Sequence, residues 1–276
     1  MQQIQAYGTR SLPPAGVTRE QGGGDGIISQ EDGMSISAPG IQDVVGFDAL
    51  WESMMKCRCG VMWKGSVSSF VLNGMANVLR LHLELKSNVY EPRKVTTFQV
   101  TSPKVRTITS TPFRDRVYQR SLNDVVLYPM VTKSFIYDNA ACQKNKGTDF
   151  ARGRLKCHYQ RHFRKYGANG YVLKIDIKQY YQTLPHKIGE KVFDCVPAWA
   201  RAMSLCVLRY QYQGNYGYNP GSQMVQLVGI SVLNDLDHFI KEQLHIKGYI
   251  RYMDDLILLH EDHDYLIYCL NAIEKK

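Results

Sequence analysis

The sequence predicts an α+β fold with one antiparallel sheet and packed helices. Residues 248–250 and 256–259 are apolar runs with the length and the β-branched or aromatic content of buried strands, and Tyr252-Met253-Asp254-Asp255 lies between them. A third run, residues 170–177, has the same character. Between residues 227 and 244 the apolar residues recur at helical spacing instead. Strands and helices are therefore expected in one body, with a tight hairpin at the acidic turn.

The N-terminal segment, residues 1–43, differs from the rest of the chain. It contains Gly22-Gly23-Gly24, Pro13-Pro14 and few large apolar side chains. Such a composition cannot bury a core, so the segment is predicted to be mobile. From Phe47 onward the chain is long enough for two packed subdomains.

The acidic turn places Asp254 beside Asp255 between two buried strands. Two ionised carboxylates repel one another, so either one takes up a proton or a cation binds the pair. Hard oxygen ligands of this kind suit Mg²⁺. A solvated turn that contains Asp-Asp by chance is the alternative interpretation of these four residues.

A third acid strengthens the metal interpretation. Asp176 ends the strand-like run 170–177, and a strand-end carboxylate and a hairpin pair can meet on one antiparallel sheet. Three acids arranged in this way can hold two divalent ions roughly 3.5–4 Å apart, which stabilises the attacking and leaving oxygens of an in-line displacement at phosphorus. The constellation therefore points to nucleotidyl transfer.

With these acids in place, the chain resembles the reverse transcriptases, in the branch of bacterial group II intron, retron and diversity-generating retroelement enzymes. The resemblance runs from about Tyr90 to the last residue and appears as four blocks in the family's order: residues 95–116, 173–186, 220–241 and 249–259. In the third block Gln226 stands where many branches have Pro, which is most like the diversity-generating retroelement enzymes. Val225, in place of a usual Ser, and Pro220, before the Gly, depart from that pattern.

The resemblance implies a right-hand polymerase of fingers and palm. The fingers would span residues 44–169 and return at 190–218, and the palm would hold residues 170–189 and 219–276. The family's next palm block and its helical thumb have no counterpart before Lys276, so we expect a chain truncated before the thumb, whether by cloning, by an incomplete reading frame or by decay of the element.

The implied activity is RNA-templated DNA synthesis from dNTPs, on an RNA template with a DNA or RNA primer. Two Mg²⁺ ions, for which Mn²⁺ can substitute, would be bridged by Asp176 and Asp254, with Asp255 assisting and Ile177 adjoining the metals. A retroelement in a bacterium or phage, a cytoplasmic location and a retroelement accessory protein as partner go with this interpretation. An antiphage-defence reverse transcriptase and a non-catalytic RNA-binding remnant remain as alternatives.

Individual side chains receive roles on the same basis. Tyr181 lies five positions after Asp176, and its ring there would collide with a ribose 2′-hydroxyl and so select deoxynucleotides. Strand alternation would let only one of Tyr180 and Tyr181 face the site. Lys104 and Arg106 would share one face of a strand and grip the triphosphate, unless that face is only solvated.

The remaining predicted contacts are with the nucleotide, primer and template. Gly221 and Gln226 are expected at the nucleotide, Tyr252 and Met253 at the primer or template. Arg114 and Arg116, on a helix capped near Thr111-Pro112, would touch template phosphate or instead pair with the neighbouring acids Asp115 and Asp124.

The composition agrees with a nucleic-acid partner. The formal net charge is +9, and residues 1–40 contain no Lys, so the positive charge lies in the rest of the chain. No stretch approaches 18 uninterrupted apolar residues, so no membrane association is expected. Seven cysteines without framework spacing are typical of reduced thiols in a cytosolic protein.

Overall fold

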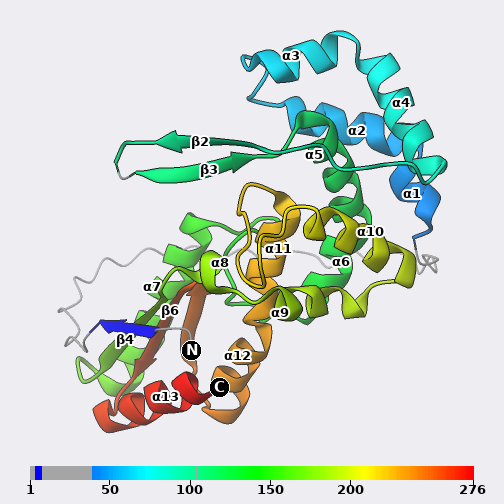
Figure 1. Ribbon diagram of the computed structural model, residues 1–276. Coiled ribbons are helices and arrows are strands. Elements are labelled where there is room, and N and C mark those ends of the chain that lie inside the picture. The colour runs from blue at the N-terminus through cyan, green and yellow to red at the C-terminus, as the bar shows by residue number, and fades with distance from the viewer. Residues whose placement is uncertain (1–3, 8–38, 104) are drawn as a thin grey trace, which may run out of the picture.

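The computed structural model describes residues 4–7, 39–103 and 105–276. A four-stranded antiparallel sheet lies at one end of the molecule (Figure 1). Its strands, in spatial order, are β1 (Ile4–Tyr7), β4 (Tyr171–Ile177), β6 (Asp255–His260) and β5 (Gly248–Tyr252). The three runs predicted as strands are therefore strands, and they belong to one antiparallel sheet.

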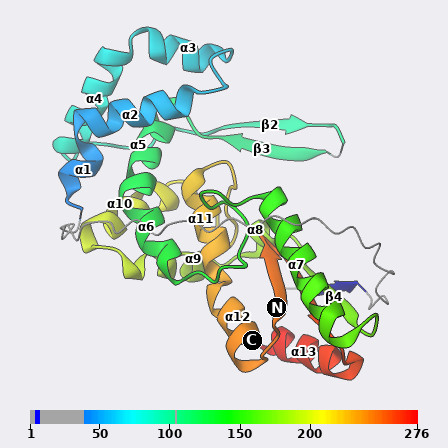
Figure 2. The same ribbon diagram turned by 180° about the vertical axis from the view of Figure 1, so that it is seen from behind.

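Alternation along the strands gives the sheet two different faces. One face carries Leu173, Ile175, Tyr249, Leu256 and Leu258, all buried. It packs against α12 (Asn234–His238), the π-helical segment η4 (Phe239–Gln243) and α13 (His263–Lys275). The opposite face, which carries the acids, is partly covered by α7 (Thr148–Tyr166), seen in front of the sheet in Figure 2.

A second, larger core joins the helices at the other end of the molecule. Its N-terminal part comprises α1 (Ile41–Val45), α2 (Phe47–Arg58), α3 (Gly65–Leu72), α4 (Gly74–Lys86) and α5 (Phe113–Leu122). The chain continues through η1 (Asn123–Leu127), α6 (Tyr128–Val131) and η2 (Thr132–Ser134). After β4 follow α8 (Tyr180–Thr183), α9 (His186–Lys191), η3 (Val192–Cys195), α10 (Ala198–Arg209) and α11 (Gln223–Val232).

A two-stranded hairpin, β2 (Thr96–Val100) and β3 (Arg106–Ser110), extends away from this helical part in both views (Figures 1 and 2). The mixture of helices and small antiparallel sheets agrees with the predicted α+β class. Within the described residues no helix is both long and apolar enough to cross a bilayer.

Two features bear on the predicted organisation. Residues 1–3 and 8–38 of the segment predicted to be mobile lie outside the described residues, whereas Ile4–Tyr7 forms β1 and pairs with β4. The averaged composition of the segment hid this short strand, which satisfies the edge of β4. In addition, α7 packs on β5 although it falls in the predicted fingers, and α11 joins the larger core although it falls in the predicted palm.

Candidate active site at one end of the sheet

The acidic residues meet where β5 turns into β6. Tyr252 pairs with Asp255, so Met253 and Asp254 form a two-residue turn, and Met253 has a φ of 56°. On the other side of β6, Asp255 pairs with Asp176 of β4. The register thus brings all three acids to one end of the sheet, although their positions in the sequence are far apart.

Burial and mutual repulsion act on the carboxylate of Asp254. Its pKa is raised, first by burial and also by the negative charges of Asp176 and Asp255. Lys174 lies two residues before Asp176, and its Nζ is 2.9 Å from Oδ1 of Asp255. Its positive charge balances part of the negative charge of the three carboxylates. The turn therefore holds a carboxylate whose ionised form a cation would favour.

The donor set fits Mg²⁺ in kind, because carboxylates are hard oxygen ligands and their repulsion is what a cation relieves. Asp176 and Asp254 would hold the ions, and Ile177 could contribute only its main chain, since its side chain is buried. In the described part of the chain, however, no three His, Cys, Asp or Glu side chains are already gathered around a metal position. The carboxylates would have to turn toward a bound ion.

Tyr180 and Tyr181 lie on α8, a helical turn that begins after Gln179, and not on a strand. The argument from strand alternation was therefore wrong, and the two rings are in edge-to-face contact, with their centroids 5.4 Å apart. Tyr180 is buried and donates a hydrogen bond to the carbonyl of Gly229 (2.6 Å). Tyr181 is partly buried, and among the described residues its hydroxyl has no hydrogen-bond partner. Burial raises the pKa of Tyr181, and the charges of Tyr180, Cys142 and Asp254 add to the shift.

Gly221 precedes α11, whose N-cap Ser222 accepts a hydrogen bond from the backbone of Val225 (3.2 Å). A side chain at Gly221 would collide with the carbonyl of Thr109 on β3. The close approach that this glycine permits is thus to the β2–β3 hairpin, whereas the sequence suggested a close approach to a ligand.

Gln226 lies one turn into α11 and lines a cavity of about 280 Å³. Asn123, also in its wall, is 1% exposed, and both polar atoms of its amide lack a partner. The other lining residues are Arg120, Asp124, Tyr128, Cys142, Gln143, Lys144, Gln223 and Leu227. The cavity is rich in amides and bears two cationic side chains.

The predicted basic contacts are placed unequally. Arg114 is buried and is bonded to Asp115 (2.9 Å), to the carbonyl of Glu91 and to the carboxylate of Glu84. This is the ion pairing that the sequence left open, and it removes Arg114 from the surface. Arg116 is half-buried with its guanidinium over Phe113 (5.2 Å). Lys104 and the side chain of Arg106 lie outside the described residues.

Tyr252 and Met253 flank the acids differently. Tyr252 is exposed at the rim of a cavity of about 240 Å³, between α7 and the sheet, that Lys174 and Asp255 also line. The sulfur of Met253 lies 3.6 Å from that of Cys142. Tyr252 is thus open to a ligand, and Met253 contacts the loop before α7.

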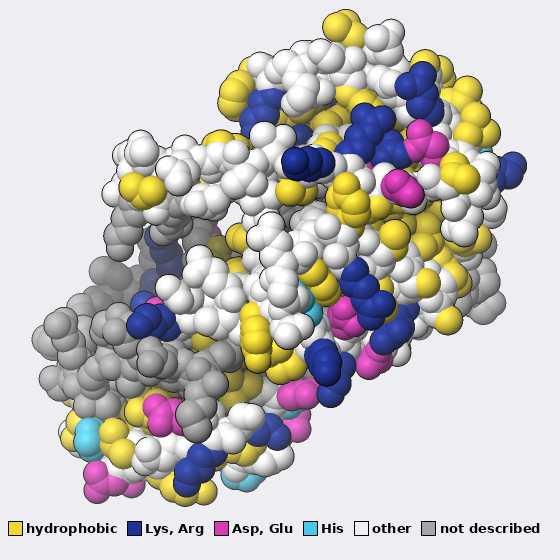
Figure 3. Space-filling view, viewed as in Figure 1, with side chains coloured by type: hydrophobic (Ala, Val, Ile, Leu, Met, Phe, Trp, Pro, Cys, Tyr) yellow, Lys and Arg dark blue, Asp and Glu magenta, His cyan; other side chains and the backbone are white. Residues whose placement is uncertain are grey.

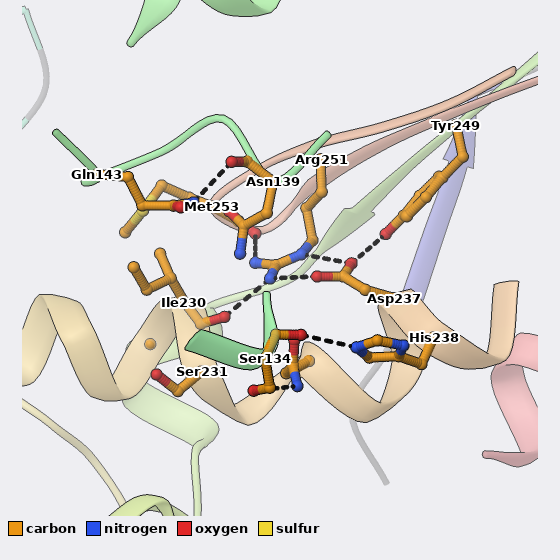
Figure 4. Close-up of polar contacts among 12 residues, drawn as sticks. Ser134, Asn139, Gln143, Ile230, Ser231, Asp237, His238, Tyr249, Arg251 and Met253 are labelled. Carbon is orange, nitrogen blue, oxygen red and sulfur yellow. Dashed lines mark hydrogen bonds and ion pairs between the residues drawn. The ribbon is translucent and has the colours of Figure 1, made fainter. Parts of the chain in front are cut away.

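A buried ion pair supports the turn from behind, and sequence reasoning missed it (Figure 4). Arg251 and Asp237 are both fully buried and make a bidentate pair, with nitrogen-to-oxygen distances of 2.7 and 2.6 Å. Tyr249 donates to the same carboxylate (2.6 Å). The sequence did contain a signal for this pair. Arg251 stands in an apolar strand and Asp237 on the apolar helix face between Leu233 and Ile240, and a charged residue in either place needs a buried partner.

Basic side chains are distributed over the molecule. On the face shown in Figure 3, Lys and Arg lie at several separate places, some beside acidic side chains. The net charge of +9 thus favours a polyanion without marking a single groove on that face.

Comparison with known proteins adds little. No protein-family model and no curated protein matches the sequence. The chain is similar to two solved structures, a partial Cas6-RT-Cas1–Cas2 complex and a Cas6-RT-Cas1–Cas2 complex, each with 16% identity, a TM-score of 0.43 and 79% of this chain covered. The similarity covers 38% of the first structure's chain and 23% of the second's. At this identity and TM-score, no conclusion about function follows.

Proposed function

We propose that this chain carries out RNA-templated DNA synthesis by nucleotidyl transfer. The observation that carries the proposal is the register that sets Asp176 opposite Asp255, directly beside the turn that holds Asp254. When bound, two Mg²⁺ ions would stabilise the charge on the attacking and leaving oxygens. Mn²⁺ would serve as a substitute.

The three acids divide the work in this proposal. Asp176 and Asp254 would hold the cations. Burial, together with the charges of Asp176 and Asp255, raises the pKa of Asp254, and a bound cation would favour its ionised form. Asp255 assists, because Lys174 already balances part of its charge at 2.9 Å. The substrates are the primer 3′-hydroxyl, which acts as nucleophile, and an incoming triphosphate.

Tyr181 selects the sugar. It lies on α8, directly after the strand that carries Asp176, and within the described residues its hydroxyl makes no hydrogen bond. A bulky ring beside the nucleotide site excludes a ribose 2′-hydroxyl and so favours deoxynucleotides.

The cavity that Gln226 lines is assigned to the incoming nucleotide and the template base with which it pairs. Buried amide atoms without a partner, such as those of Asn123, need a ligand or water to satisfy them. Amides can hydrogen-bond base edges and sugars, and Lys144 and Arg120 can contact phosphate. The contact between Cys142, in the wall of this cavity, and Met253 connects it with the acidic turn.

A retroelement of a bacterium or phage is the biological setting that Gln226 favours, with an accessory protein as partner and the cytoplasm as location. An antiphage-defence enzyme would share all the catalytic residues named above.

The test is template-directed incorporation by the 276-residue chain. Four RNA templates that differ in the first unpaired base are annealed to one labelled DNA primer and incubated with single dNTPs and Mg²⁺ or Mn²⁺. Incorporation of only the complementary dNTP, abolished by chelator, is the expected result. Binding of the primer–template without incorporation would contradict the proposal and leave the RNA-binding remnant.

A further inference from the structure

The side chain of Arg251 connects three parts of the structure behind the acidic turn. Its Nε and one Nη donate to the two carboxylate oxygens of Asp237 on α12. The same Nη donates to the carbonyl of Ile230 on α11 (2.8 Å), and the other Nη donates to the carbonyl of Met253 in the turn (2.9 Å). Figure 4 shows the guanidinium between these partners.

The contact with Met253 bears directly on Asp254. The carbonyl of Met253 belongs to the peptide group that joins Met253 to Asp254, so its orientation sets the direction in which Asp254 leaves the turn. Met253 has a φ of 56°, a left-handed conformation that is uncommon for a side chain of this size. A hydrogen bond to the carbonyl stabilises this conformation against alternatives.

Further hydrogen bonds hold both Asp237 and the backbone of Arg251 in place. Asp237 also accepts from the hydroxyl of Tyr249 (2.6 Å). The backbone of Arg251 is bonded on both sides, its N–H to the carbonyl of Asp138 (3.1 Å) and its carbonyl to the N–H of Ala140 (2.9 Å). Because the guanidinium is planar and its donors have fixed directions, it fixes the turn at Met253 and Asp254 relative to α11 and α12.

We propose that Arg251, held by Asp237, is a positioning residue that sets the orientation of Asp254 and links the turn to α11. The inference rests on the proposed function, because Asp254 is a metal-binding group only there. Arg251 touches no substrate in this scheme, and it acts through the peptide group before Asp254. α11 begins at the predicted nucleotide contacts, and its last turn supplies the carbonyl of Ile230. The side chain of Arg251 therefore connects the nucleotide region with the metal-binding turn.

The discriminating variant replaces the whole network by apolar side chains: Arg251→Met, Asp237→Leu and Tyr249→Phe together. Such a replacement of a buried ion pair commonly leaves the fold intact, so it separates positioning from stability. The matched control is Arg209→Met with Glu190→Leu, which also removes an Arg–carboxylate pair (2.6 Å) without change of net charge, between α9 and α10.

Two measurements are made on parent, triple variant and control. Amide hydrogen exchange, read by mass spectrometry on peptides that contain residues 252–255, reports the turn without any need for activity. Single-nucleotide extension across a Mg²⁺ titration reports function. We expect amide exchange at residues 252–255 to accelerate about tenfold in the triple variant but not in the control. Exchange in the rest of the chain should stay as in the parent. The extension rate should fall roughly 10–100-fold, with a higher Mg²⁺ concentration at half-maximal rate.

A triple variant whose turn exchanges like the parent's and whose extension stays within twofold would overturn the inference. If the triple variant does not fold, Arg251→Lys is measured instead, because one ammonium group cannot hydrogen-bond to Asp237, Ile230 and Met253 at once. Exchange at residues 252–255 of Arg251→Lys as slow as in the parent would likewise overturn the inference. Failure of the parent itself to extend a primer would instead contradict the proposed function, and turn exchange would still test the positioning role.

Discussion

Removing only one member of the buried ion pair should cost far more stability than replacing the whole network. In Arg251→Met, the carboxylate of Asp237 stays fully buried but loses both nitrogen donors, at 2.7 and 2.6 Å, and keeps only the hydroxyl of Tyr249. An uncompensated buried charge of this kind costs about 3–5 kcal/mol. Because domains of this kind are stable by only about 5–15 kcal/mol, this single substitution removes a large share of the free energy of unfolding.

Urea unfolding at neutral pH, followed by circular dichroism, measures this cost. The control is Arg209→Met, whose ion pair with Glu190 is more exposed and should contribute no more than about 1 kcal/mol. A free energy of unfolding for Arg251→Met within about 1 kcal/mol of the parent value would refute the reasoning, because it would mean that Asp237 is hydrated or repaired after the substitution.

Three further predictions follow from other sites. Tyr181→Val should lower discrimination against ribonucleotides by roughly 10–100-fold, whereas Tyr181→Phe keeps the ring and should discriminate as the parent does. Incorporation of competing dNTP and NTP measures this discrimination. Equal discrimination in all three proteins would show that another side chain is the gate. Burial opposes ionisation of Asp138, but the nearby ring of His158 (3.3 Å) and the hydrogen bonds from Arg154 and Lys241 outweigh it, so the pKa of Asp138 is lowered. Its contribution to stability is therefore complete above the ordinary Asp pKa, begins to decline as pH falls below about 4 and is lost only as pH passes through the lowered pKa of the folded state. Asp138→Asn should thus destabilise by roughly 2–3 kcal/mol at pH 7 and by clearly less at about pH 2; an equal difference at both pH values in urea unfolding would contradict this. Gln226, in place of a rigid Pro, should permit misincorporation opposite template adenines, and sequenced cDNA with no excess of errors at adenine would remove the retroelement interpretation while leaving the polymerase proposal intact.

Much of the sheet could be predicted because its strands carry local signals. The apolar runs around residues 248–259 alternate or cluster as strands do, and the two-residue turn at Met253 and Asp254 follows from their spacing. The approach of Asp176 to Asp255 needed a non-local step, the assumption of one antiparallel sheet, and the register satisfies it. Strand patterns and this one assumption were sufficient to bring the three acids together.

Other features depend on tertiary contacts that no local pattern shows. Tyr180 and Tyr181 follow a strand, but Gln179, at a φ of 53°, turns the chain into a helix there. The partner of Arg114 was one of several nearby acids, and only packing could choose among them. Asp237 and Arg251 are 14 residues apart on different elements, so their pairing appears only when α12 packs on the sheet.

The rate of single-nucleotide extension in Asp176→Asn and Asp254→Asn tests the central claim most directly. Both substitutions keep the shape of the side chain and remove the charge that would hold a cation, while the basic surface for nucleic acid remains. Asp264→Asn, at an exposed position on α13, is the matched control. We predict that the two site variants extend an RNA-templated primer at less than about a tenth of the parent rate but bind the primer–template nearly as the parent does. The control should extend the primer at the parent rate. Extension by either site variant at more than about a tenth of the parent rate would contradict the assignment of these carboxylates to the metal-binding site.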